Sequence, residues 1–358
     1  MNPDPTTIKA AQDKLDAHVR EIIQWHFSPE TGSPFWLDWA IKAGWNPATE
    51  VKSFADILRF PHFQDEWLRD LPNEVWVPKK YAGRPYNIFE TGGTTGMPKQ
   101  RIGWDDYKVD YSEFSEKLSD DHFPRGGAWL MVGPTGPRRL RLAVEHLANV
   151  RGSSCFFVDL DPRWVKKVIS NKQFEQARAY MDHVVDQAVI ILKHRKVSAM
   201  FTTPKLLEAL GEKVNLWESG IRGVFCGGTT MAPQYVRFIV EEVLENRIGF
   251  YPTYGNTLMG LAASVPLRPE DNFSITYYAP QPRAVLRIVD PNKTEQVKGY
   301  GEWGRVELTT LTREFFMPRF LERDEAIRRE PRAPYSWDGV AEVRPFGAME
   351  KNIVEGVY

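Results

Sequence analysis

A run of glycine and threonine stands out in the first third of the chain: Thr91-Gly92-Gly93-Thr94-Thr95-Gly96-Met97-Pro98-Lys99. Its glycines let the backbone adopt positive φ and approach a ligand closely. The threonine hydroxyls and consecutive backbone amides can donate to anionic oxygens, and Lys99 adds a cation. The run therefore predicts a loop that holds a phosphate chain, and the alternative is a flexible surface loop. It is not the P-loop of nucleoside triphosphatases, because Lys99 does not directly follow a glycine and no Ser or Thr follows it.

The middle of the chain alternates between short apolar runs and helical patterns. The apolar runs suit strands buried on both faces, and they cover residues 128–133, 155–158, 199–202 and 223–226. The helical patterns cover residues 138–149, 162–194 (with a break), 204–212 and 231–244. This alternation predicts crossover units and a parallel sheet.

The two ends of the chain have other patterns. Residues 8–27 predict one amphipathic helix, and residues 35–80 are rich in Trp and Pro, with a short helix over 53–58. Residues 284–289 and 304–311 alternate as strands with one wet face. We expect one α/β domain with three subregions, a Trp-rich segment (1–85), an α/β core (86–265) and a β-rich end (266–358).

Composition excludes several classes of protein. The 358 residues carry 46 basic and 47 acidic side chains, so no general electrostatic footprint for nucleic acid is present. Two cysteines, Cys155 and Cys226, cannot build a disulfide scaffold, and we expect both to be buried inert thiols. No apolar run is long enough for a membrane helix, and the polar start of the chain does not resemble a signal peptide. A cytoplasmic protein without membrane segments is expected.

Four more segments follow the first run along the chain. They are Gly227-Gly228-Thr229, Tyr251-Pro252-Thr253-Tyr254-Gly255-Asn256-Thr257, Gly301-Glu302-Trp303-Gly304-Arg305-Val306-Glu307-Leu308-Thr309 and Met317-Pro318-Arg319-Phe320-Leu321-Glu322-Arg323-Asp324. In kind and order, the five segments resemble the motifs of the adenylate-forming superfamily of acyl-CoA synthetases, peptide-synthetase adenylation domains and luciferases. The resemblance implies the large N-terminal domain of these enzymes, a layered αβαβα fold with a β-rich subdomain.

The resemblance also implies roles for individual residues. The phosphates of ATP would be held by Thr91, Gly92, Gly93, Thr94, Thr95, Gly96 and Lys99. The AMP part would be held by Gly227, Gly228 and Thr229 along the adenine, Tyr254 stacked on it, Gly255, Thr257 at the α-phosphate and Asp324 at the ribose. The acid would lie near Gly133, Pro134, Tyr251 and Thr253. Its carboxylate would attack the α-phosphorus to give an acyl-AMP, and no base is needed because a carboxylic acid is ionised at neutral pH.

Two departures from the family pattern bear on catalysis. The family's Mg²⁺-binding glutamate falls on Leu258, which cannot ligate a metal, so the ion would depend on Glu307, water or phosphate oxygens. After Asp324 only residues 325–358 follow, whereas the family continues into a mobile C-terminal domain with a catalytic lysine. We therefore expect that domain to be lacking.

The C-terminal segments 344–346 and 355–358 are similar to phenylacetate–CoA ligases. The resemblance extends to shortened members of that group associated with phenazine antibiotic (griseoluteic acid) biosynthesis, which implies an aryl carboxylate of the phenazine type as substrate. It also implies an acyl acceptor, a carrier or a reductase protein as partner, and it is compatible with an oligomer. The alternative is a nucleotide- or acyl-adenylate-binding scaffold or delivery protein with little catalysis. Leu258 favours the scaffold, and the 91–99 loop favours the enzyme.

Overall fold

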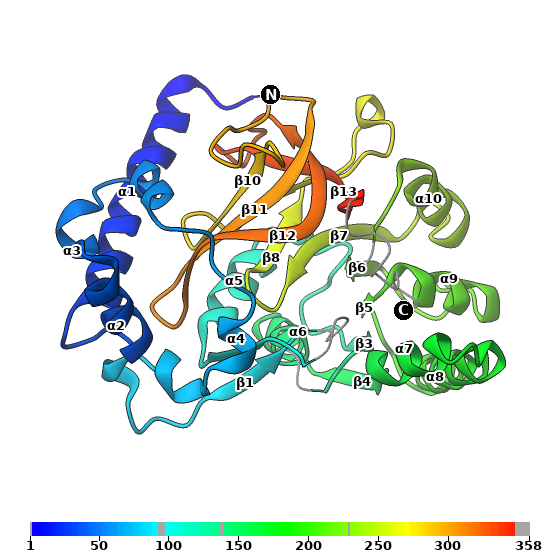
Figure 1. Cartoon of the computed structure of the whole chain (residues 1–358). Coiled ribbons are helices and arrows are strands. Elements are labelled where there is room, and N and C mark those ends of the chain that lie inside the picture. The colour runs from blue at the N-terminus through cyan, green and yellow to red at the C-terminus, as the bar shows by residue number, and fades with distance from the viewer. Residues whose placement is uncertain (1, 92–96, 137–138, 228–229, 348–358) are drawn as a thin grey trace. The chain divides into compact units, whose positions relative to one another are not determined.

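The computed structural model describes residues 2–91, 97–136, 139–227 and 230–347 (Figure 1). The chain forms two compact units. Of the described residues, the first unit contains 2–90, 97–106 and 276–347, and the second contains 91, 107–136, 139–227 and 230–275. Within the described residues, no helix is both long and apolar enough to cross a membrane.

The second unit is built on a mainly parallel sheet. Its strands are β3 (Trp129–Gly133), β4 (Cys155–Asp159), β5 (Ala199–Thr202), β6 (Gly223–Gly227), β7 (Gly249–Asn256) and β8 (Gly260–Ser264), in the order β8-β7-β6-β5-β3-β4. Only β8 runs antiparallel to its neighbour in this part of the sheet. The strands predicted over 128–133, 155–158, 199–202 and 223–226 are confirmed within a residue at each end.

Helices cover both faces of this sheet. Consecutive side chains of a strand point to opposite faces, so an apolar strand has two faces to bury. Val224 and Cys226 of β6 pack into a core that α8 (Phe174–His194) and α9 (Pro204–Lys213) share. Phe225, between them, contacts Phe114 of α5 (Asp106–Ser115) at a ring distance of 5.1 Å. The central strands are therefore apolar on both faces, as the sequence indicates.

The remaining helices of the second unit are α6 (Arg139–Val150), α7 (Pro162–Ser170), α10 (Pro233–Phe238), a π-helical turn (Ile239–Val243) and a 3₁₀ turn (Pro269–Asp271). The predicted break within 162–194 is confirmed: α7 ends at Ser170, and Lys172 has φ of +59°. The helix predicted over 231–244 is shorter, since α10 starts at Pro233 and changes to π-helical geometry after Phe238.

The first unit begins with helix α1 (Pro5–Phe27), which confirms the predicted N-terminal helix. Asp4 caps it by accepting from the backbone N–H groups of Thr6 and Thr7, and Leu15, Val19, Ile22 and Ile23 are buried. Short helices follow: α2 (Pro34–Ala43), α3 (Pro47–Glu50), a 3₁₀ helix (Phe54–Arg59), α4 (Trp67–Asp70) and two 3₁₀ turns (Asn73–Trp76 and Lys79–Tyr81).

An antiparallel sheet completes the first unit. Its strands are β9 (Thr276–Tyr278), β10 (Ala284–Val289), β11 (Trp303–Leu311), β12 (Phe316–Arg329) and β13 (Gly339–Pro345), in the order β10-β11-β12-β13-β9. The strands predicted over 284–289 and 304–311 are confirmed as β10 and β11. A separate hairpin joins β1 (Asn87–Glu90) to β2 (Gln100–Gly103), so the 91–99 run connects these two strands.

Candidate functional site

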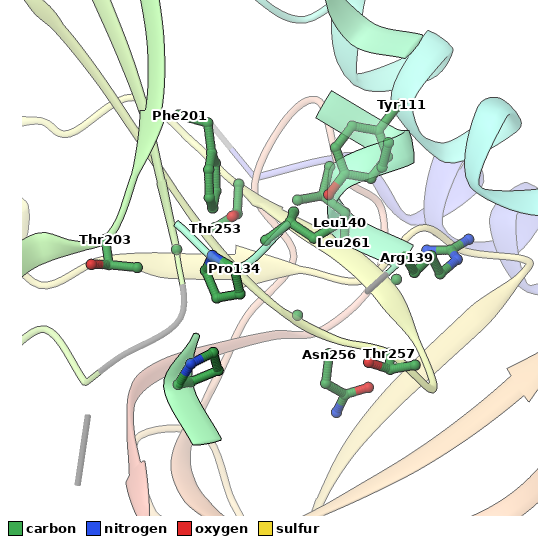
Figure 2. A pocket seen from close by; sticks show the side chains of 15 residues that line it. Tyr111, Pro134, Arg139, Leu140, Phe201, Thr203, Thr253, Asn256, Thr257 and Leu261 are labelled. Atoms are coloured by element: carbon green, nitrogen blue, oxygen red, sulfur yellow. The ribbon is translucent and has the colours of Figure 1, made fainter. Parts of the chain in front are cut away.

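A cavity of about 170 Å³ lies in the second unit (Figure 2). It is lined by Tyr111, Pro134, Arg139, Leu140, Ala143, Pro162, Phe201, Thr203, Gly227, Thr253, Gly255, Asn256, Thr257, Gly260 and Leu261. The lining residues range from Tyr111 to Leu261, so segments more than a hundred residues apart in the sequence meet at this cavity. In the view of Figure 2, Thr203 and Arg139 lie on opposite sides, with Pro134 and Leu140 between them.

The topology of the sheet explains where this cavity forms. From β3 the chain passes through α6 to β4 on one side, and from β4 it returns through α7 and α8 to β5 on the other side. The loops after β3 and β5 therefore diverge, and such a switch point leaves a crevice outside the carboxyl ends of the strands. Pro134 directly follows β3, Thr203 follows β5 and Gly227 ends β6.

The structure brings together some of the residues that the sequence assigns to the acid. Pro134 and Thr253 line the cavity, and the Thr253 hydroxyl donates to the carbonyl oxygen of Cys226 at 3.3 Å. Gly133 and Tyr251 are not among the lining residues. Tyr251 instead packs its ring against Phe123 at 5.1 Å, and burial raises the pKa of its hydroxyl.

Among the residues assigned to AMP, Gly227, Gly255 and Thr257 line the cavity. Gly255 is required where β7 approaches β8, because a Cβ there would lie 2.1 Å from the carbonyl oxygen of Gly260. Tyr254 is half-buried on β7 and is not among the lining residues. Asp324 lies in β12 of the first unit, opposite Pro345 of β13.

A tight turn after β7 presents Thr257 at the cavity. The Asn256 side-chain oxygen accepts from the backbone N–H groups of Leu258 and Met259, both at 2.9 Å. Leu258 is buried in the apolar interior, and the turn thus places a hydrocarbon side chain where the family pattern has a carboxylate.

A buried ion pair at the cavity was not anticipated from the sequence. The Arg139 Nη2 donates to Asp110 Oδ2 at 2.9 Å, and both side chains are about 95% buried. Gly260 lies against this pair: it has φ of +104°, and a Cβ there would be 2.7 Å from both Arg139 Nη1 and Asp110 Oδ2. The sequence signal was an arginine in the first turn of a helix, directly after the Gly/Pro-rich loop that follows β3.

In the first unit, Lys99 belongs to a cluster of cations around Asp65. Lys99 Nζ lies 3.1 Å from Asp65 Oδ1, while Arg69 Nη2 and Arg323 Nη2 lie 2.5 Å and 3.1 Å from Asp65 Oδ2. Burial raises the pKa of Asp65, but Lys99 and Arg69 outweigh this and hold the pKa below its usual value. The end of the 91–99 run and the 317–324 segment therefore meet at one carboxylate.

Glu307 is the centre of a second charged network in the first unit. Its carboxylate accepts from Arg287 Nη1 at 2.8 Å and Arg319 Nε at 3.3 Å, and His62 Nε2 is 3.2 Å away. Burial raises the pKa of Glu307, yet His62 and the two guanidinium groups lower it overall. Two guanidinium groups at these oxygens disfavour a divalent cation, so the surroundings of Glu307 do not fit a Mg²⁺ site. In the part of the chain that the structure describes, no group of three or more His, Cys, Asp or Glu residues could hold a metal ion.

Other predicted residues have simpler outcomes. Gly92, Gly93, Thr94, Thr95, Gly96, Gly228 and Thr229 lie outside the described residues, and Thr91 is half-buried directly after β1. Burial raises the pKa of the Cys155 thiol to about 12 and also raises that of Cys226. Neither thiol is a nucleophile at neutral pH.

The chain is similar to known proteins in its fold. No protein-family model matches the chain, and no curated protein matches it. An open conformation of 2-hydroxyisobutyryl-CoA ligase, in complex with 2-HIB-AMP and CoA, has a TM-score of 0.68 and 16% identity, over 93% of this chain and 69% of the ligase chain. The same ligase in the thioesterification state has a TM-score of 0.68 and 18% identity, over 95% of this chain and 68% of the ligase chain.

At these identities the likeness shows the fold. It confirms the expected fold class, that of the large N-terminal domain of adenylate-forming ligases.

Proposed function

We propose that the chain binds ATP and a carboxylic acid and joins them as an acyl-AMP, with release of pyrophosphate. One observation carries the proposal. Gly227, Gly255 and Thr257, which the motifs assign to the nucleotide, line the same cavity as Pro134 and Thr253, which they assign to the acid. Solved structures of similar fold belong to a ligase in complex with an acyl-AMP, 2-HIB-AMP, which supports the same chemistry.

The reaction needs little from the protein beyond positioning and charge. The acid is already ionised at neutral pH, so its carboxylate oxygen attacks the α-phosphorus and the bond to the pyrophosphate oxygen breaks. Thr257 would donate to the α-phosphate, and Lys99 would neutralise the leaving pyrophosphate. We assign no protein ligand to Mg²⁺, because position 258 is leucine and Glu307 is held by arginines.

We further propose an aryl carboxylate as the acid. Tyr111, Phe201, Leu140 and Leu261 give the cavity apolar and aromatic walls, which favour a flat ring over a charged chain. Phenazine-type acids are the particular aryl acids that the sequence resemblance suggests. A thiol, a carrier protein or a reductase would then take the activated acyl group.

The alternative is a protein that binds a nucleotide or an acyl-adenylate without efficient catalysis. The burial of Leu258 favours it, because the turn that carries Thr257 holds no carboxylate at that position for a metal. The two functions differ in whether the protein releases pyrophosphate. A scaffold that only binds a nucleotide does not need contacts to this leaving group.

Carboxylate-dependent ATP–pyrophosphate exchange separates the two functions. The acids to test are 2-hydroxyisobutyrate, benzoate, phenylacetate and phenazine-1-carboxylate. We expect exchange with an aryl acid, a loss of about tenfold or more in Thr257→Val, and no change in the exposed control Thr6→Val. Lys99→Ala should lower exchange with little loss of AMP binding measured by calorimetry. AMP binding without exchange for any acid supports the scaffold, and absence of nucleotide binding contradicts both functions.

A further inference from the structure

A second cavity, of about 530 Å³, lies within the first unit and shares no lining residue with the candidate site. Residues 285–288 of β10 line it, together with Ile8 and Leu15 of α1. Consecutive residues of a strand point to opposite faces of a sheet, so a cavity that touches four in a row runs along the edge of the strand. Strand β10 is the first strand of its sheet and pairs with β11 on its inner side (Figure 1). The cavity therefore lies along the outer edge of β10.

The hydrogen bonds of β10 show which backbone groups face this outer edge. The backbone N–H of Leu311 donates to the carbonyl oxygen of Arg283 at 2.7 Å, so residue 283 directs its carbonyl group toward β11. The backbone N–H of Lys298 donates to the carbonyl oxygen of Ile288 at 2.8 Å, on the outer side. Backbone groups of an antiparallel strand point to the two sides in turn, with a period of two residues. The N–H and the C=O of Leu286 therefore also point to the outer side.

Part of the outer edge is already covered by the chain itself. Residues 296–298 return along β10, where Val297 forms a bridge to the strand. The chain then leaves the edge, and the backbone N–H of Gly301 donates to the carbonyl oxygen of Arg328 on β12, at 2.9 Å. Among the described residues, none forms a hydrogen bond with the outward N–H or C=O of Leu286. A strand edge with open backbone groups is a template for pairing with another strand.

The open backbone groups of Leu286 require a donor and an acceptor together. Leu286 is 6% exposed, so its outward N–H and C=O have little access to water. Backbone groups without a partner in such a place cost free energy. One residue of an extended peptide offers an N–H and a C=O on the same side, and it can exchange two hydrogen bonds with Leu286 as in an antiparallel ladder. A peptide strand therefore supplies both partners at once.

The charged side chains that line the cavity have partners of their own. Arg328 Nη2 lies 2.7 Å from Asp338 Oδ2, and Arg287 Nη1 donates to Glu307 at 2.8 Å. Glu330 is exposed, and water and salt screen its charge. A charged ligand would lose water in this cavity without gaining a new counter-charge, so the surroundings favour an uncharged ligand.

Large hydrophobic side chains flank the open edge. Ile8, Val297 and Tyr300 line the cavity and are 37%, 40% and 48% exposed. A ligand in the cavity would cover these side chains and remove their apolar surface from water, which favours binding. The side chains of the ligand are therefore expected to be apolar.

We propose that the outer edge of β10 binds an extended, uncharged peptide segment with apolar side chains as an added strand. Strand addition of this kind takes its affinity from backbone hydrogen bonds and its specificity from side-chain contacts. Residues 285–288 span about 10 Å, so about three residues of the ligand fit beside them, with the middle one opposite Leu286. The proposal involves neither ATP nor an acid, so it stands or falls apart from the proposed function.

The probe is the peptide acetyl-Val-Ile-Val-amide, titrated calorimetrically into the full chain. Methylation of the isoleucine nitrogen removes the donor to the C=O of Leu286, and we expect it to weaken binding about tenfold. Methylation of the third residue's nitrogen is the matched control, because that N–H points away from β10. It should leave the affinity unchanged. A peptide with lysine in place of both valines should bind about tenfold more weakly, because its charges lose water without gaining a partner.

Two further measurements test whether the peptide binds at this edge. In hydrogen exchange followed by NMR, the peptide should slow exchange of the Leu286 amide about tenfold and leave Val285, whose amide faces β11, unchanged. Val297→Trp puts a larger side chain at the cavity and should weaken binding about tenfold. The matched control is Val109→Trp, at a 47% exposed position of α5, which should keep the original affinity.

Absence of binding at millimolar peptide would overturn the proposal, as would equal effects of the two methylations. Unchanged exchange of the Leu286 amide in the presence of bound peptide would overturn it as well. If sedimentation shows a dimer that Val297→Trp separates, the edge is occupied by a second copy of the chain, and a separate peptide partner is contradicted. If Val297→Trp does not fold, the two methylated peptides decide the question without it.

Discussion

Glu307 is a single residue that joins distant parts of the first unit. It lies on β11, and its carboxylate binds Arg287 of β10 and Arg319 of β12. Arg319 also donates to the carbonyl oxygens of Leu58 and Phe60 at 2.9 and 3.0 Å. Removing one member of such a network leaves the charge of the others buried without compensation.

We therefore predict that Glu307→Ala lowers the free energy of unfolding by about 3–5 kcal/mol. The matched control is Glu21→Ala, because Glu21 also binds an arginine, Arg313 at 2.7 Å, but at a half-exposed site. Its cost should stay below about 1 kcal/mol. Urea unfolding of both variants measures the difference, and equal losses would contradict the prediction.

The same network has a pH dependence of known sign. The pKa of Glu307 is lowered in the folded protein, because His62 and the guanidinium groups outweigh the effect of burial. A carboxyl group whose pKa is depressed by folding stabilises the protein above its ordinary pKa, near 4.5. This contribution is lost as the pH falls below that value, so Glu307→Ala should lose less stability than the unaltered protein on acidification.

At the scale of elements, α1 and α2 bind the backbone of the segment between β11 and β12. His18 Nε2 and His26 Nε2 lie 2.8 Å from the carbonyl oxygens of Leu311 and Thr312. Trp25 and Trp36 donate to the carbonyl oxygens of Arg313 and Phe316 at 2.9 and 3.2 Å. Side chains from the helices thus supply donors to carbonyl groups in the turn that joins β11 to β12 and at the strand ends beside it.

The contacts of His18 and His26 predict that the folded protein loses stability at pH values above those at which carboxylates titrate. Burial lowers the pKa of His26 to about 4, and it also lowers that of His18. The unfolded chain takes up a proton near pH 6.5 and the folded chain does not, so stability falls as the pH drops from 6.5 towards 4. His26 alone accounts for at most about 3 kcal/mol.

The measurement is the free energy of unfolding between pH 7 and pH 5. We expect its slope to be smaller in His26→Gln, which keeps a donor for Thr312 but cannot take up a proton. His183→Gln, at an exposed position of α8, should keep the original slope. An unchanged slope in His26→Gln would show that His26 does not titrate differently in the two states.

The elements differ in how far the sequence predicted them. Strands β3, β5 and β6 are short, uniformly apolar and bounded by turn residues, and their pattern was sufficient. Strand β12 was missed because it includes Pro318 and a charged stretch, and its burial changes along its length where the ladder with β11 shifts register. The hairpin of β7 and β8 was missed because residues 251–257 were interpreted only as a ligand-binding motif.

The candidate site was also only partly predictable from the sequence. Motif order was enough to single out Pro134, Gly227, Thr253, Gly255 and Thr257, which line one cavity. Charge partners were not predictable, because pairing depends on the fold. Asp110 and Arg139 lie on successive helices, and Asp65 meets cations from three parts of the chain. A sequence gives the charges but not their distances.

At the scale of the whole chain, the β3–β5 pairing of the second unit and the docking of α1 within the first unit close loops of different lengths. In the second unit, β3 and β5 pair Trp129 with Ala199, 70 residues later, through helices formed in between. In the first unit, His18 meets Leu311 across 293 residues. Closing the longer loop costs about 1 kcal/mol more in chain entropy than closing the shorter one. Such a cost makes the closure roughly tenfold slower.

We therefore predict that the sheet of the second unit forms before α1 docks onto the rest of the first unit. In pulsed hydrogen exchange during refolding, backbone amides of β3, β5 and β6 should become protected earlier than those of α1. Trp36→Phe removes the donor to Phe316 and should leave the protection of β3 unchanged. Simultaneous protection of α1 and β3, or a delay in β3 in the variant, would mean that these parts of the chain fold as one cooperative structure.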